Sequence, residues 1–222
     1  MGASAPPPPL DDFVPFGGRL CLDFVNTVNG RLTDTPEDVL PSPSALVSWG
    51  RQTGLLSKTA AERLDAHFDR DAALAADALA AARALREMLY AIFDAIALGT
   101  PPADGAAARL VDAYRVALAG ARLVAGGAGR PWRWQPLPSD EPGQLGWLRW
   151  PVLSSAIELL TSSDLARLKR CAGADRGCAG LFVDETRNRS RRWCRMEACG
   201  SRAKMRRLYA RQRSGSPSRV ER

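Results

Sequence analysis

The chain has 222 residues, of which 45% are hydrophobic, and a formal net charge of +7. This length suits one medium-sized domain plus a small one, and the apolar content is sufficient for a true core. No uninterrupted apolar run approaches the roughly 18 residues of a membrane-spanning helix, so we expect no membrane segment and a cytoplasmic protein. The first residues contain four consecutive prolines and lack the basic and apolar regions of a signal peptide, so residues 1–15 are predicted to be a disordered tail.

Positive charge is concentrated near the C-terminus. Residues 164–213 contain 15 lysines and arginines against five acids, a net charge of +10, whereas residues 1–163 carry a net charge of −4. Opposite charges on the two parts indicate a module that binds polyanions, attached to a domain that does not. The alternative is a basic surface that is merely solvated.

The spacing of apolar residues at three and four positions predicts a mainly helical domain over residues 16–163. Ser, Thr and Asp stand where helices would begin, as in the capping-box pair Thr59 and Glu62, and Gly or Pro stands where they would end. Residues 31–43 are predicted to be a loop. The predicted helices are, in chain order, 17–29, 44–49, a short helix from 53, 59–68, 72–98, 104–120 and 152–160.

Two tryptophan-rich segments interrupt the helical pattern. Residues 132–134 and 147–150 alternate large apolar and charged side chains, and a segment rich in Pro, Ser, Asp and Gly separates them. We predict an antiparallel hairpin between these segments, with the tryptophans in its core. The predicted fold class is therefore α+β, with a mainly helical N-terminal domain and a small antiparallel β hairpin.

Four of the five cysteines fall within 29 residues, in the spacing C-x6-C-x15-C-x4-C, whereas Cys21 lies apart and is predicted to be a buried free thiol. Disulfides do not persist in the cytoplasm, so clustered cysteines there indicate metal. Four thiolates give zinc a closed tetrahedral shell, which predicts one structural Zn²⁺. Two disulfides, unconnected thiols and an iron–sulfur cluster are the alternatives. The predicted ligands are Cys171, Cys178, Cys194 and Cys199.

The residues around these cysteines predict a small fold built on the metal. Residues 181–183 are strand-like, a polar turn follows, and residues 191–194 return toward the third cysteine. A helix is predicted after the last cysteine. A knuckle, a hairpin and a helix that carries the last ligand make up a treble-clef-like zinc finger.

Residues 178–204 (CAGLFVDETRNRSRRWCRMEACGSRAK) resemble the CGNR zinc finger, and the resemblance extends over roughly 171–207. Residues 18–28 (GRLCLDFVNTV) resemble the opening of the ABATE domain, which is described as a stress-induced transcription regulator. Two features depart from the pattern: Ser201 replaces the asparagine of the Cys-Gly-Asn-Arg motif, and the first knuckle is longer. The resemblance implies an ABATE-like domain over 16–163 and a CGNR-like finger over 164–213. Residues 214–222 are predicted to be a disordered tail.

The helix predicted after the last cysteine is both amphipathic and basic. Met205, Leu208 and Tyr209 share one face and are expected, like Trp193, to belong to the core. Cations flank that face and also follow residue 186, so both segments are expected to contact DNA phosphates. RNA binding is the closest alternative, and exposed aromatic side chains would favour it. The candidate nucleic-acid contacts are Arg187, Arg189, Arg191, Arg192, Arg202, Lys204, Arg206, Arg207 and Arg211.

Three polar residues, Asp23, Asn26 and Thr27, stand in the otherwise apolar first helix. They either line the small-molecule pocket that the ABATE resemblance implies, or satisfy local backbone groups, which is the interpretation we favour. We keep them as candidate ligand-binding residues for a small-molecule effector.

No motif favours catalysis. The only histidine, His67, falls on a predicted helix far from the finger, and the chain has neither a Gly-rich phosphate loop nor a Gly-x-Ser-x-Gly motif. We therefore predict a zinc-dependent, DNA-binding transcriptional regulator and not an enzyme. The alternatives are an RNA-binding protein and a zinc-stapled protein-interaction module.

Overall fold

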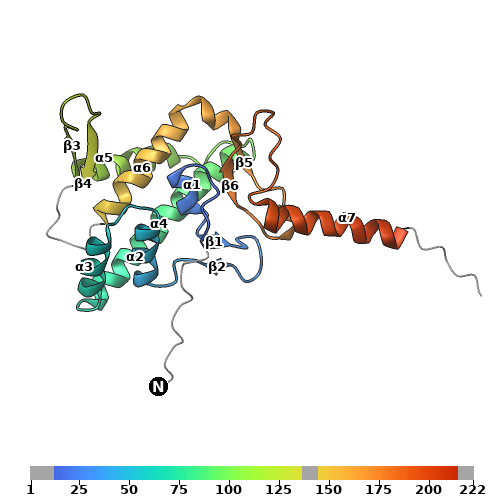
Figure 1. Ribbon diagram of the computed structural model, residues 1–222, viewed down its shortest axis with the longest axis horizontal. Coiled ribbons are helices and arrows are strands. Elements are labelled where there is room, and N and C mark those ends of the chain that lie inside the picture. Colours follow the sequence, from blue (N-terminus) through green and yellow to red (C-terminus); the bar gives the residue numbers. More distant parts are fainter. Residues whose placement is uncertain (1–12, 137–144, 215–222) are drawn as a thin grey trace, which may run out of the picture.

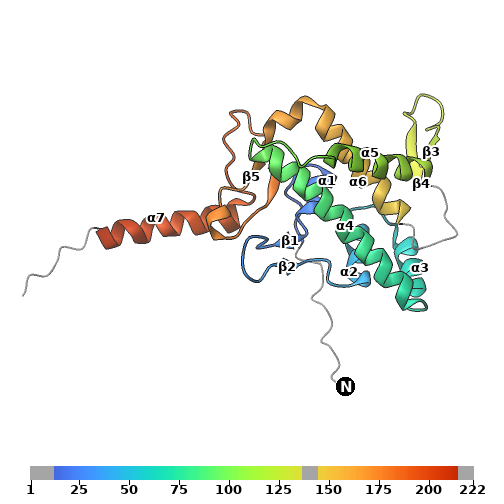
Figure 2. The same cartoon turned by 180° about the vertical axis from the view of Figure 1, so that it is seen from behind.

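The computed structural model describes residues 13–136 and 145–214. A helical body occupies most of the molecule, and a small cysteine-containing module with a long C-terminal helix lies at one end (Figure 1). This arrangement confirms the predicted fold class. Seen from behind, the last helix again projects away from the body (Figure 2). No helix in the described part of the chain is both long and apolar enough to cross a membrane.

Three of the described helices of the body begin at a side-chain cap, and two of these caps lie at other residues than we predicted. Ser42 and Ser57 accept hydrogen bonds from the backbone N–H groups three residues on, so each of these helices starts earlier than predicted. Asp71 caps the long central helix, whose predicted extent is confirmed. The helices are α1 (Leu20–Val25), α2 (Pro43–Gln52), α3 (Lys58–Phe68), α4 (Ala72–Ala97), α5 (Ala106–Ala119) and α6 (Gly146–Thr161).

The core forms around α4. Its buried face, which includes Ala82, Leu89 and Phe93, repeats at helical spacing and packs against α1, α2 and α6. Phe24 of α1 and Trp49 of α2 are both fully buried, and their ring centroids lie 5.2 Å apart.

The described residues form three two-stranded antiparallel sheets. In the first, β1 (Val28–Asn29) pairs with β2 (Glu37–Asp38), and in the second, β3 (Ala121–Val124) pairs with β4 (Arg133–Pro136). In the third, β5 (Leu168–Arg170) pairs with β6 (Leu181–Val183). Because α4 spans the body, it contacts α3 at one end and β5 and β6 at the other.

The predicted tryptophan hairpin is wrong in its second strand. Residues 133–136 are a strand, but they pair with β3, and residues 147–150 lie in α6. The spacing of Trp147 and Trp150 is i, i+3, which places them on neighbouring positions of a helix. Trp150 is buried, stacks on Tyr114 of α5 and packs against Trp134, but Trp132 and Trp134 are 65% and 46% exposed, so the predicted tryptophan core is wrong for these two residues.

The predicted hairpin of the finger is also wrong in its pairing. Strand β6 pairs with β5, which precedes the first cysteine, and not with residues 191–194. Side chains alternate across β6: Leu181 and Val183 belong to the core of the body, whereas Phe182 belongs to a second cluster with the cysteines. One strand therefore joins the two cores.

Candidate metal centre

The four predicted ligands converge from four separate backbone segments. Cys171 follows β5, Cys178 follows a 3-10 turn (Ala174–Arg176), Cys194 ends a long loop, and Cys199 lies in a single π-helical turn (Met196–Gly200). The turn leads directly into α7 (Ser201–Ser214). The treble-clef-like order of knuckle and ligand-bearing helix is thus present.

The spacing of the sulfur atoms fits zinc. All four Sγ atoms lie within 4.8 Å of one another, and the Cys178–Cys194 and Cys194–Cys199 separations are 3.7 and 3.6 Å. A tetrahedron with Zn–S bonds of about 2.3 Å has edges of about 3.8 Å, close to these values. In the described part of the chain every cysteine is free of disulfide bonds, so the disulfide alternative is wrong. The four residues therefore form a site that can hold one zinc ion.

The crowded sulfur atoms cannot all ionise by themselves. Hydrogen bonds with Cys178 and Cys194 lower the pKa of Cys171 to about 2, whereas the bond with Cys171 raises the pKa of Cys178 to about 12. Cys171 and Cys178 likewise raise the pKa of Cys194. A divalent cation that binds all four sulfur atoms must displace the remaining protons, so metal binding releases protons and weakens in acid.

Donors around the cluster suit a negatively charged centre. Zinc bound by four thiolates is a net anion. The backbone N–H of Cys194 donates to Cys171 Sγ (3.4 Å), and Nη2 of Arg202 donates to Cys199 Sγ (3.5 Å). These contacts orient the ligands and offset their charge.

The long first knuckle contacts the body. Its turn ends at Gly177, whose carbonyl accepts a hydrogen bond from the N–H of Leu32 (3.0 Å). Gly177 has a φ of +80°, and a Cβ there would lie 2.1 Å from Thr33 Cγ2. Only glycine allows this approach, so the additional knuckle residues serve as a docking point.

A buried aspartate, Asp184, organises the loop between β6 and Cys194. It is fully buried and accepts hydrogen bonds from Nζ of Lys169 (2.6 Å), from the hydroxyl of Thr186 (2.6 Å) and from the backbone N–H of Arg191 (2.9 Å). Burial opposes ionisation, but Lys169 and Thr186 hold the pKa of Asp184 well below its usual range. The prediction missed Asp184, although Asp is a common turn residue whose side chain accepts the backbone N–H two residues on, here that of Thr186 (3.0 Å).

Asp184 positions a loop that carries predicted nucleic-acid contacts. Arg187, Arg189 and Arg192 are exposed on it. Arg191 differs, because its guanidinium donates to the carbonyls of Phe16 (3.0 Å) and Trp193 (3.1 Å) and stacks 4.2 Å from the ring centroid of Phe182. Arg191 thus supports the zinc cluster from within the protein.

The predicted contacts in α7 are only partly free. Arg202 and Lys204 are exposed, whereas Arg206 forms an ion pair with Asp175 at 3.3 Å. Arg207 and Arg211 lie in α7, but their side chains fall outside the described part of the structure.

The prediction that the apolar face of α7 packs in the core is wrong. Met205, Leu208 and Tyr209 are 45%, 48% and 58% exposed, and Trp193 is only half-buried. The small side chain of Ala203, 5% exposed, takes the position facing the finger instead. Beyond it the helix leaves the body (Figure 1), so its later turns extend past both cores.

The three candidate ligand-binding residues are engaged within the protein. Asp23 accepts hydrogen bonds from the N–H groups of residues 16 and 17, and Thr27 donates to the Phe24 carbonyl (2.7 Å). Asn26 is 5% exposed and bonds both the carbonyl (2.8 Å) and the N–H (2.9 Å) of Leu181 in β6. These contacts favour the structural interpretation, although for Asn26 the backbone partner is distant in sequence.

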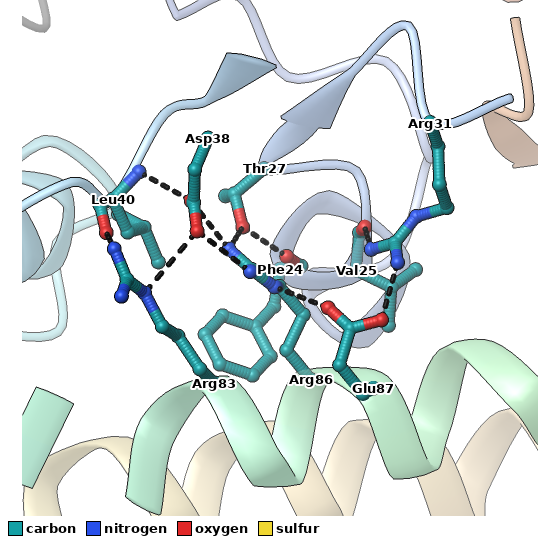
Figure 3. A network of polar contacts seen from close by, with 9 residues as sticks. All are labelled: Phe24, Val25, Thr27, Arg31, Asp38, Leu40, Arg83, Arg86 and Glu87. Carbon is teal, nitrogen blue, oxygen red and sulfur yellow. Dashed lines mark hydrogen bonds and ion pairs between the residues drawn. The ribbon is translucent and has the colours of Figure 1, made fainter. Parts of the chain in front are cut away.

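A network of ion pairs on α4 was not predicted (Figure 3). The guanidinium of Arg86, 5% exposed, donates to both carboxylate oxygens of Asp38 (2.7 and 2.9 Å) and to Thr27. Arg83 also contacts Asp38, at 3.2 Å, and Glu87 pairs with Arg31. The only sequence signal for this network was an arginine on the apolar face of α4, which is easily overlooked in a chain with 31 lysines and arginines.

A helical body joined to a basic four-cysteine finger defines a two-part zinc-finger protein. The chain belongs to the ABATE family, described as "Putative stress-induced transcription regulator", whose family model matches residues 18–163. The CGNR zinc finger model matches residues 167–212. No curated protein matches the chain. The resemblance stated from the sequence is therefore confirmed.

Proposed function

We propose that the protein is a transcription regulator that binds duplex DNA through its zinc finger. The observation that carries the proposal is the position of exposed cations on two elements that the cysteine cluster joins, the loop 184–194 and α7. The net charge of +10 over residues 164–213 attracts phosphate, whereas the body, with −4 over residues 1–163, repels it. Binding is therefore expected at the finger.

The proposed interface is smaller than the sequence alone indicated. Arg191 and Arg206 already have partners within the protein, so we assign them a supporting part. Among the exposed side chains, Arg202 bonds a ligand sulfur and Arg192 lies 5.5 Å from the ring centroid of Trp193, and both remain exposed to solvent. The proposed phosphate contacts are Arg187, Arg189, Arg192, Arg202 and Lys204.

The proposal gives the zinc ion no catalytic part. Four protein thiolates fill a tetrahedral shell and leave no position for water or substrate. His67 lies in the last turn of α3, at the opposite end of the molecule from the finger (Figure 1). We therefore propose a binding protein and not an enzyme.

The helical body is the proposed sensor of a small-molecule effector. Its first helix is bonded to β6 through Asn26, and Arg19 forms ion pairs with Asp164 and Glu185. A ligand that shifts α1 would therefore shift the strand that leads to the loop of exposed arginines.

The test is the salt dependence of DNA affinity, measured by fluorescence anisotropy with the full-length, zinc-loaded protein and a labelled duplex. Five phosphate contacts predict a slope of about −4.5 for log affinity against log salt concentration. Arg187→Ala and Lys204→Ala should each reduce the slope by about one unit. Arg115→Ala is the matched control, because Arg115 is exposed on α5 of the body. A slope near zero, or an equal effect of the control, would contradict the proposal.

The exposure of Tyr209 favours single-stranded RNA as a second candidate ligand, since an exposed ring can stack on an unpaired base. The same assay with a single-stranded RNA separates the two. Tighter binding to RNA than to duplex DNA, lost in Tyr209→Ala, would favour the second candidate.

A further inference from the structure

The apolar face of α7 is open to solvent. Met205, Leu208 and Tyr209 lie on one side of the helix and are each about half exposed, and Met196, in the preceding turn, is 60% exposed. Isolated apolar side chains on a surface are ordinary, but a contiguous group marks a binding surface. We call Met196, Trp193, Met205, Leu208 and Tyr209 the α7 apolar surface.

This surface is hollowed. A groove of about 440 Å³ lies between the start of α7 and the preceding segment, with Trp193 and Met196 on one side and Ala203 and Leu208 on the other. Gly200 lets the Met196 side chain lie directly against the backbone of the groove, because a Cβ there would be 2.4 Å from Met196 Sδ and the side chain would have to shift. A groove of this size holds one or two apolar side chains of a partner, and methionine walls adapt to their shape.

Charge decides the kind of partner. Residues 201–214 contain six lysines and arginines and no acid, and the helix places Arg202 and Lys204 on opposite flanks of the apolar stripe. A second copy would bring the same positive charge to the surface and be repelled. DNA phosphates would satisfy the cations but offer nothing apolar for the groove. A segment with acidic residues on either side of apolar anchors satisfies both.

We propose that the α7 apolar surface binds an acidic amphipathic helix of another protein, with apolar anchors in the groove and carboxylates against Arg202 and Lys204. The proposal goes beyond DNA binding and does not depend on it. α7 projects from the body, so its two sides are separately accessible (Figures 1 and 2). A partner helix on this side leaves the arginines of the loop 184–194 free for nucleic acid but engages Arg202 and Lys204, so the partner and DNA would compete for these two cations.

The test uses the full-length, zinc-loaded protein and labelled helical peptides in fluorescence anisotropy. The first peptide has leucines at i, i+3, i+4 and i+7 and glutamates elsewhere. The second keeps the glutamates and replaces the leucines by serine, and the third keeps the leucines and replaces glutamate by lysine. The first peptide should bind at least about tenfold more tightly than either of the others.

Two variants of the chain make the test specific. Leu208→Ser should lower the affinity for the acidic amphipathic peptide at least about tenfold, without loss of bound zinc or of affinity for DNA. Leu123→Ser is the matched control: Leu123 of β3 is 47% exposed, against 48% for Leu208, and lies at the other end of the molecule. The control should leave peptide affinity unchanged.

Four results would overturn the proposal. The first is equal binding of the peptides with and without leucine, and the second is an equal effect of the control variant. The third is loss of DNA affinity in Leu208→Ser, which would place the surface in the DNA interface. The fourth is that the acidic amphipathic peptide fails to bind, while the protein instead dimerises or binds vesicles of phosphatidylglycerol and phosphatidylcholine, and Leu208→Ser abolishes that dimerisation or vesicle binding.

Discussion

The helical body and the finger are stabilised in different ways. The body buries a continuous core in which Phe24, Trp49 and Phe93 are fully enclosed. The buried cluster of the finger consists of Phe182 and three of the cysteines, with Phe16, Cys178 and Trp193 packed against it. Apolar burial alone can stabilise the body, whereas so small a cluster needs the free energy of metal binding. The body is a scaffold, and the finger is a structure that depends on its metal.

The boundary between the two regions is a shared strand. Leu168, Leu181 and Val183 all lie beyond residue 163 but belong to the core of the body. The prediction that residues 16–163 fold without the finger stays a prediction, and a fragment ending there would lack these side chains. The body therefore shares the β5–β6 hairpin with the finger, whereas the small cluster of the finger depends on zinc.

Loss of one zinc ligand should have the largest effect on the finger. Cys194→Ser removes a ligand from a site whose binding free energy is on the order of 10 kcal/mol, so the segment from the loop to α7 should lose its fold. Elemental analysis should show about one zinc ion per wild-type chain and far less in the variant, and hydrogen exchange should rise in residues 184–214.

Cys21→Ala is the control for this experiment. Cys21 is fully buried in α1 of the body, and burial raises its thiol pKa to about 12, so it is neither exposed nor ionised. The zinc content of Cys21→Ala should equal that of the wild type. A zinc-free wild type, or body helices that melt together with the finger in Cys194→Ser, would contradict the division of roles.

In the body, the corresponding weak point is the Arg86–Asp38 pair. Asp38→Ala should lower the free energy of unfolding by about 3 kcal/mol, because Arg86 would be left buried without its main partner. Burial opposes ionisation of Asp38, but Arg86 outweighs it and lowers the pKa of the carboxyl. A carboxyl whose pKa is lower in the folded than in the unfolded protein stabilises the fold at pH values above its unfolded pKa. This stabilisation is lost as the pH falls through the folded pKa.

Denaturant unfolding at several pH values tests this. The difference between wild type and Asp38→Ala should be full at neutral pH and shrink below about pH 4. A difference that does not change with pH would mean that the pair contributes by packing and not by charge.

Asn26→Ala should lower the free energy of unfolding by less, and it should affect both the body and the finger. It removes two hydrogen bonds to Leu181 and leaves a buried backbone N–H and C=O without partners, at a cost of about 2 kcal/mol. Hydrogen exchange should increase in β5 and β6 as well as in α1. Asn29→Ala, at an exposed neighbouring position, should change neither stability nor exchange.

Met205→Ser should have the smallest effect on stability, within about 0.5 kcal/mol of the wild type, because the side chain is already 45% exposed. Thermal unfolding of the zinc-loaded protein measures this. A large loss of stability would restore the interpretation that this face of α7 packs in the core.

The sequence predicted what depends on local chemistry. The cysteine spacing predicted the metal site, and the caps and the Ala-rich run predicted α4. It did not predict strand partners: β6 could pair with either neighbour, and the choice depends on where Leu181 and Val183 find a core. The face of α7 was misassigned because periodicity shows that apolar residues share a side, not that anything covers it.

The buried charges were missed for a similar reason. Burial of Arg86 and Asp184 depends on partners that are distant in sequence or in an irregular loop, and a basic sequence does not show which cation is enclosed. Likewise, the sequence did not show that Arg191 bonds groups within the protein whereas Arg187, Arg189 and Arg192 are exposed.

In the function proposed above, zinc holds the exposed arginines of the finger in an arrangement that binds DNA. The most direct test is the affinity of the full-length protein for one duplex at one near-physiological salt concentration, with zinc bound and after its removal by a chelator. We predict at least about tenfold weaker binding without zinc, because the loop and α7 must then be ordered at the cost of binding free energy, and full recovery when zinc is restored. Equal affinity with and without zinc would contradict the account.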